Sequence, residues 1–394
     1  MTYAFALHQF SLLCFVLLLV LIALANMLTL QRLGRYPKSA DRPKVSVLIP
    51  ARNEESNIGA CAESVLEQDY PSLEVIVLDD MSSDQTAQVV AALAGKDLRL
   101  KTLVGAPLPE SWLGKHWACH QLSDAATGEL LLFIDADTLL KCNAVGAGVD
   151  ALSAAKADLL CALPHQTMGT WAERLLVPLM YWSIQSFLPL ALADRLAIRS
   201  LSAAVGQYML FRRDSYRRIG GHAAVRGDVV DDLALARLIR GNGLRLHLVD
   251  GQDHLTCRMY RGWREVRDGF GKTLFAAFRY RTGLFLFVWA FLTVVFTEPL
   301  GVLLWARLGG AVPSDSINVA GASVLASVLL WALSFWRFRV PLYLACAYPL
   351  IVLLGGYVAV RSLLLTRSGK MVWKGRMLRV GSAWREFAEK EGVE

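Results

Sequence analysis

The amino-acid sequence predicts an α/β domain that has a mainly parallel sheet and is flanked by transmembrane and interfacial helices. Apolar residues make up 55% of the 394-residue chain, and they are concentrated in residues 1–32 and 284–365. The part between these regions has the charge and glycine content of a globular domain. Short apolar strands alternate there with helix-like stretches, which is typical of a parallel sheet.

The first apolar run, residues 10–30, contains no charged residue and is long enough to cross a membrane as a helix. No lysine or arginine precedes it and no small-residue cleavage site follows it, so we expect an uncleaved anchor over residues 1–32 rather than a signal peptide. The basic flank that follows marks the cytoplasmic side and consists of Arg32, Arg35, Lys38, Arg42 and Lys44. We therefore expect a multi-pass protein of the inner (cytoplasmic) cell membrane whose catalytic domain faces the cytoplasm.

The seven cysteines and the net charge of +7 bear on compartment and partners. The cysteines are odd in number and lack the spacing of metal-ligand or redox pairs, which indicates reduced thiols. Many basic residues lie beside the apolar runs, where anionic lipid headgroups are the simpler partner. We expect the bilayer and no nucleic acid as a partner, and the oligomeric state stays open.

The globular part, residues 43–281, begins with a strand over residues 45–50, followed by a helix over residues 56–68. Further strands are expected at residues 74–80, 98–104 and from residue 129 onward. Ligands of such sheets bind beyond the carboxyl ends of the strands, where the polar signatures of this chain also lie.

Two segments are expected to lie on the membrane surface. Residues 171–198 are apolar and aromatic but interrupted by two prolines, and residues 260–281 alternate aromatic and basic side chains. Trp182 and Phe187 of the first segment are expected to line a groove for a lipid.

The carboxyl-terminal part contains three apolar runs within residues 284–365, followed by a basic tail over residues 366–394. Three full spans would place this tail outside, against the positive-inside rule. One run is therefore a candidate for a re-entrant segment, and the first run carries Glu298 and Pro299 in its middle.

Two acidic motifs follow predicted strands. Asp79 and Asp80 suit the uracil imide and the ribose hydroxyls of a nucleotide, although the same residues are compatible with a simple strand-to-helix turn capped by Asp84. Asp135 and Asp137 point to the same side of the chain because strand side chains alternate. Their hard oxygen ligands suit Mg²⁺ or Mn²⁺ bridging a diphosphate.

A third acidic pair, Asp231 and Asp232, opens a predicted helix. A carboxylate at this position can take the proton from an attacking hydroxyl, and we assign that role to Asp232. The alternative is that both residues only complement the helix dipole.

Taken together, the motifs resemble family 2 glycosyltransferases with the GT-A fold. The matching pieces are PARNEE, LDDMSSDQT, the Gly114–Lys115 pair, DAD, GQYMLFRRDSYRRIGG, the Asp231–Asp232 pair and RMYRGW, in family order over residues 45–275. The resemblance implies that Glu54, Asp79 and Asp80 bind the nucleoside with Lys115 nearby, and that Asp135 and Asp137 bind the metal. It assigns Asp232 to the base, and Arg258, Arg261 and Trp263 to the region of the diphosphate and the acceptor. Asp135 is also placed at the donor, and His254 occupies the place of a third metal ligand in some sugar transferases.

The sequence looks closest to the membrane-bound members that glycosylate carotenoid or hopanoid-type polyprenoids. It departs from polymer-making members, because an Arg258-containing stretch stands in place of Gln-X-X-Arg-Trp. The expected function is inverting transfer of a sugar from a nucleotide-sugar, UDP-hexose by family default, to such a membrane lipid. The alternatives are a processive polysaccharide synthase, a glucosyltransferase acting on a glycerolipid or sphingolipid, and a binding scaffold without turnover.

Overall fold

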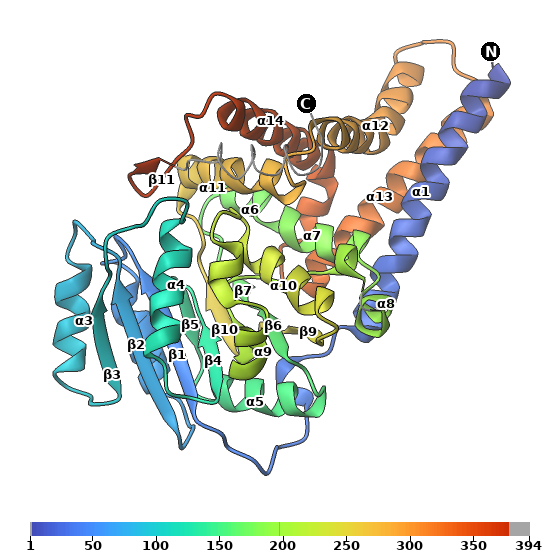
Figure 1. Ribbon diagram of the computed structural model, residues 1–394. Coiled ribbons are helices and arrows are strands. Elements are labelled where there is room, and N and C mark those ends of the chain that lie inside the picture. The colour runs from blue at the N-terminus through green and yellow to red at the C-terminus, as the bar shows by residue number, and fades with distance from the viewer. Residues whose placement is uncertain (1, 197, 378–394) are drawn as a thin grey trace. The chain divides into compact units, whose positions relative to one another are not determined.

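The structure is a computed structural model that describes residues 2–196 and 198–377 (Figure 1). The chain folds into two compact units, each assembled from segments that are distant in the sequence. Unit 1 contains residues 2–29, 168–191 and 260–367, and unit 2 contains residues 30–167, 192–259 and 368–377. The rest of the basic tail, including Arg379, lies outside the described residues.

Unit 2 is built around a seven-stranded sheet with the order β3-β2-β1-β4-β8-β6-β9. All of its strands run parallel except β8, which is antiparallel to both of its neighbours. The strands are β1 (Val45–Ala51), β2 (Leu73–Asp79), β3 (Leu100–Val104), β4 (Leu130–Phe133), β6 (Leu159–Leu163), β8 (Met209–Arg212) and β9 (Leu246–Asp250). The predicted α/β class with a mainly parallel sheet is confirmed.

The central strands are buried on both faces, which explains why they are continuously apolar in the sequence. In β1, Val47, Leu48 and Ile49 have no exposed surface. Helices of unit 2 connect the strands, as parallel pairing requires. They are α2 (Ile58–Leu66), α3 (Thr86–Ala94), α4 (Gly114–Ala125), α5 (Ala144–Ala154), α9 (Arg213–Arg218) and α10 (Asp231–Gly241). The carboxyl ends of β1, β2 and β4 therefore lie at one edge of the sheet.

Two smaller sheets complete unit 2. One joins β5 (Thr138–Leu140), β10 (Leu255–Cys257) and β7 (His165–Gln166). The other is a hairpin of β11 (Val372–Trp373) and β12 (Arg376–Met377), which comes from the carboxyl-terminal part of the chain.

A buried carboxylate, Glu74, ties β2 to its surroundings. Its Oε1 accepts hydrogen bonds from Ser46 Oγ at 2.5 Å and from Thr127 N at 2.6 Å. Burial by itself would raise the pKa of Glu74, but the hydrogen bonds from Ser46 and Thr127 outweigh it and lower the pKa to about 2. The ionised form of Glu74 therefore stabilises the folded unit.

Replacing Glu74 by glutamine is expected to lower the free energy of unfolding by about 2 kcal/mol at pH 7, since charged hydrogen bonds in a buried network are lost. Because the folded-state pKa is lowered, this difference should shrink as the pH falls from about 4.5 towards 2. Thermal unfolding of purified protein measures it, with Glu129→Gln at an exposed position as control. Equal stability of the two variants at pH 7 would contradict the assignment.

Among the described residues, unit 1 contains four helices that are long and apolar enough to cross a membrane, judged by length and composition. They are α1 (Thr2–Thr29), α12 (Thr282–Arg307), α13 (Ser314–Arg337) and α14 (Tyr348–Arg367), the last preceded by the 3-10 turn η4 (Leu342–Ala347). Helices α1 and α13 lie side by side (Figure 1). Gln9 and His8 of α1 contact the Glu298 carboxylate of α12 at 2.6 and 3.1 Å, so this polar group has partners inside unit 1.

The segments expected at the membrane surface join these helices in the fold. Residues 168–191 form α6 (Trp171–Leu176) and α7 (Pro178–Phe187), and α8 (Leu190–Arg195) continues into unit 2. Trp182 was expected to line a groove, but it is only 3% exposed and stacks on Trp331, with 4.4 Å between the ring centroids. The expectation is wrong for this residue, because its ring belongs to the packed interior of unit 1.

Helix α11 (Gly262–Ala277), from the second of these segments, also belongs to unit 1. It packs against α14 and α6. Asp268 of α11 forms a 2.9 Å ion pair with Arg361 of α14.

Candidate active site

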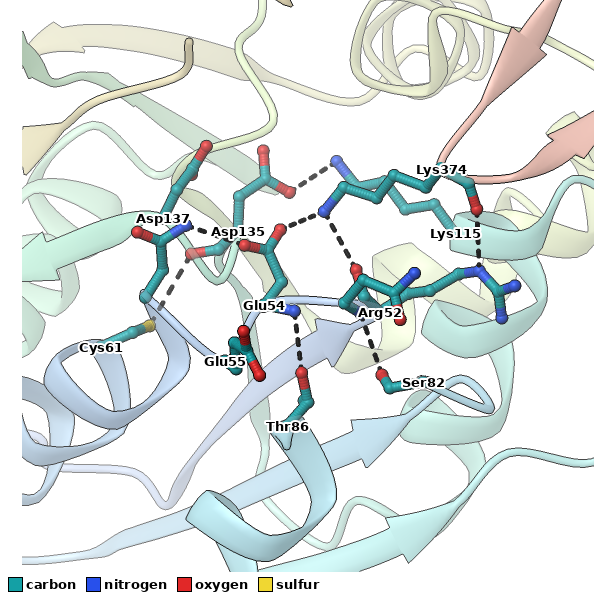
Figure 2. Close-up of polar contacts among 12 residues, drawn as sticks. Arg52, Glu54, Glu55, Cys61, Ser82, Thr86, Lys115, Asp135, Asp137 and Lys374 are labelled. Carbon is teal, nitrogen blue, oxygen red and sulfur yellow. Dashed lines mark hydrogen bonds and ion pairs between the residues drawn. The ribbon is translucent and has the colours of Figure 1, made fainter. Parts of the chain in front are cut away.

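The loop after β1 is fastened to the loop after β2. The Glu54 backbone N–H donates to Thr86 Oγ1 at 2.8 Å, and the Asn53 N–H donates to Ser82 Oγ at 2.9 Å (Figure 2). Asn53 has a positive φ of 51°, a conformation that asparagine tolerates better than most residues. The two motifs therefore form one structural element at the carboxyl edge of the sheet, and Glu54 is presented from it.

Asp79 is the last residue of β2 and Asp80 follows it, as the sequence predicts. The surroundings of the two carboxylates differ. Asp79 is half-buried and accepts a long hydrogen bond from the Ser82 N–H at 3.3 Å. Asp80 is 3% exposed. Burial raises the pKa of Asp80, although a bidentate contact with Arg376 opposes this effect.

Asp135 and Asp137 follow β4 at the same edge. Lys115 Nζ lies 2.7 Å from Asp135 Oδ1 (Figure 2). Asp137 accepts hydrogen bonds from the Cys257 thiol at 3.4 Å and the Thr138 hydroxyl at 3.5 Å, and within the described part of the chain it forms no ion pair with lysine or arginine.

The Asp137 carboxylate lies close to two other negative charges. Burial, together with the negative charges of Asp135 and Glu54, raises its pKa to about 7. No group of three His, Cys, Asp or Glu side chains within residues 2–196 and 198–377 forms a complete metal site. The two aspartates nevertheless suit Mg²⁺ or Mn²⁺, which bind a few carboxylates and take further oxygen ligands from a substrate's phosphates.

Asp231 and Asp232 form the first turn of α10. Lys115 Nζ lies 3.5 Å from Asp231 Oδ2 as well as close to Asp135. Burial would lower the pKa of Lys115, but these two carboxylates hold it well above its usual value. Lys115 thus links the acidic pair after β4 to the pair that begins α10.

Gly206 marks the point where these side chains converge. A Cβ added to it would lie 3.0 Å from Lys115 Nζ, 3.5 Å from Asp135 Oδ2 and 4.0 Å from Asp232 Oδ2. The acidic motifs that are separate in the sequence therefore surround one small region of unit 2.

The family model described as Glycosyl transferase family 2 matches residues 46–220. This range includes Glu54, both residues of the Asp79–Asp80 pair and the aspartates after β4. Residues 46–220 of the chain therefore match a family 2 glycosyltransferase domain.

Curated relatives agree with this match. The 4,4'-diaponeurosporenoate glycosyltransferase of Staphylococcus aureus strain USA300 is 26% identical over 233 residues, which are 58% of this chain and 60% of that protein. The protein of the same name from strain MRSA252 is 27% identical over the same shares. The chain thus matches about 60% of the length of these relatives.

A solved structure confirms the GT-A fold of this glycosyltransferase family member. The mannosyltransferase PcManGT from Pyrobaculum calidifontis, in complex with GDP-Man and Mn²⁺, aligns over 100% of this chain and 96% of its own, with a TM-score of 0.52 and 18% identity.

The RMYRGW motif of the family 2 chain is divided between the units. Arg258 is half-buried in unit 2, whereas Arg261 and Trp263 belong to unit 1. There, Trp263 stacks on Tyr357 with a centroid distance of 6.2 Å. The roles of these three residues at the diphosphate and acceptor stay predictions.

His254 does not lie beside the Asp137 carboxylate. Strand β10 pairs with β5 so that Cys257 faces Thr138, whereas His254 precedes the strand at its other end. Its ring packs against Gly34, where an added Cβ would lie 2.8 Å from His254 Cε1. The residue that contacts Asp137 from this part of the chain is Cys257, which sequence reasoning missed.

Sequence reasoning also missed two basic residues of the tail. Lys374 forms an ion pair with Glu54, and Arg376 forms one with Asp80 at 2.5 Å (Figure 2 shows Lys374). The adjacent Lys374–Gly375 pair is a local signal for a tight hairpin turn. No local pattern indicates that this turn reaches residues some 300 positions away.

The family 2 enzyme is expected to lose activity as the pH falls through about 7. Burial, and then the charge of Asp231, raises the pKa of Asp232 to about 7, and a base must be deprotonated to accept a proton. For a hydroxyl acceptor, kcat/KM should rise about tenfold per pH unit below this value and level off above it. Asp231→Asn removes one of the raising charges and should move the rise to lower pH. A flat profile from about pH 5.5 to 8 would exclude Asp232 as the titrating base.

Proposed function

We propose that this chain transfers a hexosyl group, with inversion, from a nucleotide-sugar to a hydroxyl or carboxyl group of a membrane lipid. The observation that carries the proposal is the gathering of Glu54, Asp80, Asp137 and Asp232 around the carboxyl edge of the unit 2 sheet. One site would then combine hydrogen-bond acceptors for a nucleoside, oxygen ligands for a cation, and a base with a pKa near 7.

Each carboxylate has a separate task in this proposal. Glu54, Asp79 and Asp80 accept hydrogen bonds from the nucleoside of the donor, for which UDP is the family default. Asp135 and Asp137 would hold a Mg²⁺ or Mn²⁺ ion, which neutralises charge on the leaving diphosphate. Asp232 takes the acceptor proton as the acceptor oxygen attacks the anomeric carbon from the face opposite the diphosphate.

Lys115 lies between the acidic pair after β4 and the acidic pair that begins α10. Its ammonium group contacts Asp135 and Asp231, so it balances the charge around Asp232 without pairing with Asp232 itself. This arrangement leaves the Asp232 carboxylate available as a base.

The lipid acceptor is supported by two findings of different kinds. The four long apolar helices of unit 1 give the chain the means to reside in a membrane, where a lipid acceptor is present. The curated relatives are named 4,4'-diaponeurosporenoate glycosyltransferase. We propose a carotenoid or hopanoid-type polyprenoid as the acceptor, and a catalytic unit on the cytoplasmic face of the inner membrane.

The test is manganese-dependent release of nucleoside diphosphate by detergent-purified protein. UDP-glucose and GDP-mannose are each offered with a panel of hydroxylated and carboxylated polyprenoids, a glycerolipid and a sphingolipid, and Asp232→Asn is the inactive control. Release that requires a polyprenoid supports the proposal. Release without any lipid, accompanied by a growing polysaccharide, would replace the lipid transferase by a polymer synthase.

A further inference from the structure

The hairpin β11–β12 is shaped to project its turn. Val372 pairs with Met377 and Trp373 with Arg376, which leaves Lys374 and Gly375 as a two-residue turn. Both turn residues have positive φ, 45° and 76°, as the tightest hairpin turns require. Lys374 adopts a backbone conformation that is uncommon for residues other than glycine.

The hairpin is fastened to unit 2 by contacts on both sides of the loop after β1. Lys374 Nζ donates to the Arg52 carbonyl oxygen at 3.1 Å and also bonds to Glu54, while Arg52 Nε donates to the Lys374 carbonyl oxygen at 3.3 Å. Figure 2 shows the Lys374 side chain reaching Glu54 beside Lys115 and Asp135. The turn therefore enters the region that holds the donor in the proposed function.

Arg376 makes the second attachment. Its Nη1 and Nη2 donate to Asp80 Oδ2 and Oδ1 at 2.5 and 3.0 Å, a bidentate pair. The Arg376 side chain is only 19% exposed and that of Asp80 only 5%. A guanidinium that is largely removed from water needs an anionic partner at all times.

Gly114 leaves the space through which Arg376 reaches Asp80. A Cβ at this position would collide with Arg376 Nη1 and lie 3.0 Å from Asp80 Oδ2. The φ of Gly114 is not in the left-handed region, so backbone conformation does not explain the glycine. The space that the Arg376 guanidinium needs explains the glycine at this position.

We propose that Lys374 and Arg376 bind the diphosphate of the donor. This inference rests on the proposed function. In the structure the carboxylates of Glu54 and Asp80 stand in for phosphate oxygens, which a guanidinium binds in the same bidentate way. When the donor is bound, the two cations contact its diphosphate, and Glu54 and Asp80 accept hydrogen bonds from the nucleoside instead. The tail of the chain thereby completes the donor site.

The experiment compares nucleoside diphosphates with nucleosides. Binding of UDP, GDP, uridine and guanosine to the full-length protein in detergent with Mn²⁺ is measured by calorimetry for the native chain, Lys374→Ala, Arg376→Ala and the double variant. Lys370→Ala, at an exposed position of the same tail, is the matched control. For the double variant we expect the affinity for the diphosphate to fall about 10- to 100-fold, while the affinity for its nucleoside is unchanged or rises. Arg376→Lys, which keeps the charge but not the bidentate geometry, should lie in between.

Several results would overturn the inference. In the double variant, the affinity for the diphosphate could be unchanged, or the affinities for diphosphate and nucleoside could fall equally. Tighter binding of both ligands would also overturn it, because the hairpin would then only obstruct the site. Arg376→Lys gives the comparison if the alanine variants do not fold. A native protein that binds neither UDP nor GDP would instead overturn the proposed function, and this inference with it.

Discussion

Replacing Asp232 by asparagine is expected to lower kcat for a hydroxylated lipid acceptor by about a thousandfold, while donor affinity stays close to that of the native chain. General-base catalysis contributes about a hundredfold to ten-thousandfold, and asparagine keeps the size of the side chain without its basicity. Asp232 lies in the first turn of α10, and its Oδ1 accepts a hydrogen bond from the Leu233 N–H at 2.7 Å. Nucleoside diphosphate release with UDP-glucose, Mn²⁺ and a hydroxylated polyprenoid measures the change.

Asp214→Asn is the matched control, because Asp214 is an exposed aspartate in the first turn of the neighbouring helix α9. If Asp232 only complemented its helix dipole, both substitutions would cost a few tenths of a kcal/mol of stability and leave kcat alone. Equal kcat for the two variants would therefore remove Asp232 from the chemistry.

The same variant can identify the acceptor group. A carboxylic acid is already ionised at neutral pH, so its transfer needs no base, whereas a hydroxyl group must lose its proton during attack. With a carboxylated polyprenoid the loss on Asp232→Asn should therefore be far smaller than a thousandfold. The ratio of the two losses distinguishes an enzyme that forms a glycosyl ester from one that forms a glycoside.

Replacing Asp137 by asparagine is the change with the second-largest expected effect. It removes the charge of a carboxylate that accepts hydrogen bonds from Cys257 and Thr138, and with it a main ligand of the proposed cation. We expect activity to fall by more than about a hundredfold, because oxygen ligands for the cation are lost and the leaving diphosphate is less well stabilised. The dependence of UDP binding on Mn²⁺ should largely disappear, which calorimetry with and without Mn²⁺ records.

Asp124→Asn, whose side chain is 70% exposed, serves as the control for this substitution. If UDP binding by Asp137→Asn depended on Mn²⁺ as strongly as it does in the native chain, other residues would hold the ion.

Much of the catalytic unit could be predicted because its signals are local. The strand expected at residues 45–50 is observed as Val45–Ala51, and the helix expected over residues 56–68 is observed as Ile58–Leu66. Parallel strands bring their carboxyl ends together, so acidic residues after three of them could be expected to meet. The role of Asp232 is assigned from its position at a helix start and by the resemblance, and a pair of carboxylates at a helix start has a local explanation as well.

Other features depend on contacts that no local pattern reveals. Trp182 lies in a segment with the aromatic content of a membrane surface, yet its ring is packed between helices that follow more than 100 residues later. Lys374 and Arg376 contact residues that lie about 300 positions earlier in the chain. Their positive charge alone does not indicate these contacts, because a basic flank beside an apolar helix explains it locally. The catalytic domain expected over residues 43–281 stays a prediction, and the structure divides the chain into two units that are each built from segments distant in the sequence.

The ion pairs of the hairpin also restrict the number of membrane crossings in the carboxyl-terminal part of the chain. The chain leaves unit 2 after Met259 and returns to it with residues 368–377, whose Lys374 and Arg376 contact Glu54 and Asp80. Departure and return on the same side of a bilayer require an even number of crossings between them. Three full spans by α12, α13 and α14 do not meet this condition, whereas none or two of them do. Helix α12 is the candidate for a segment that does not cross, because Pro299 lies in its interior and its Glu298 is held by α1.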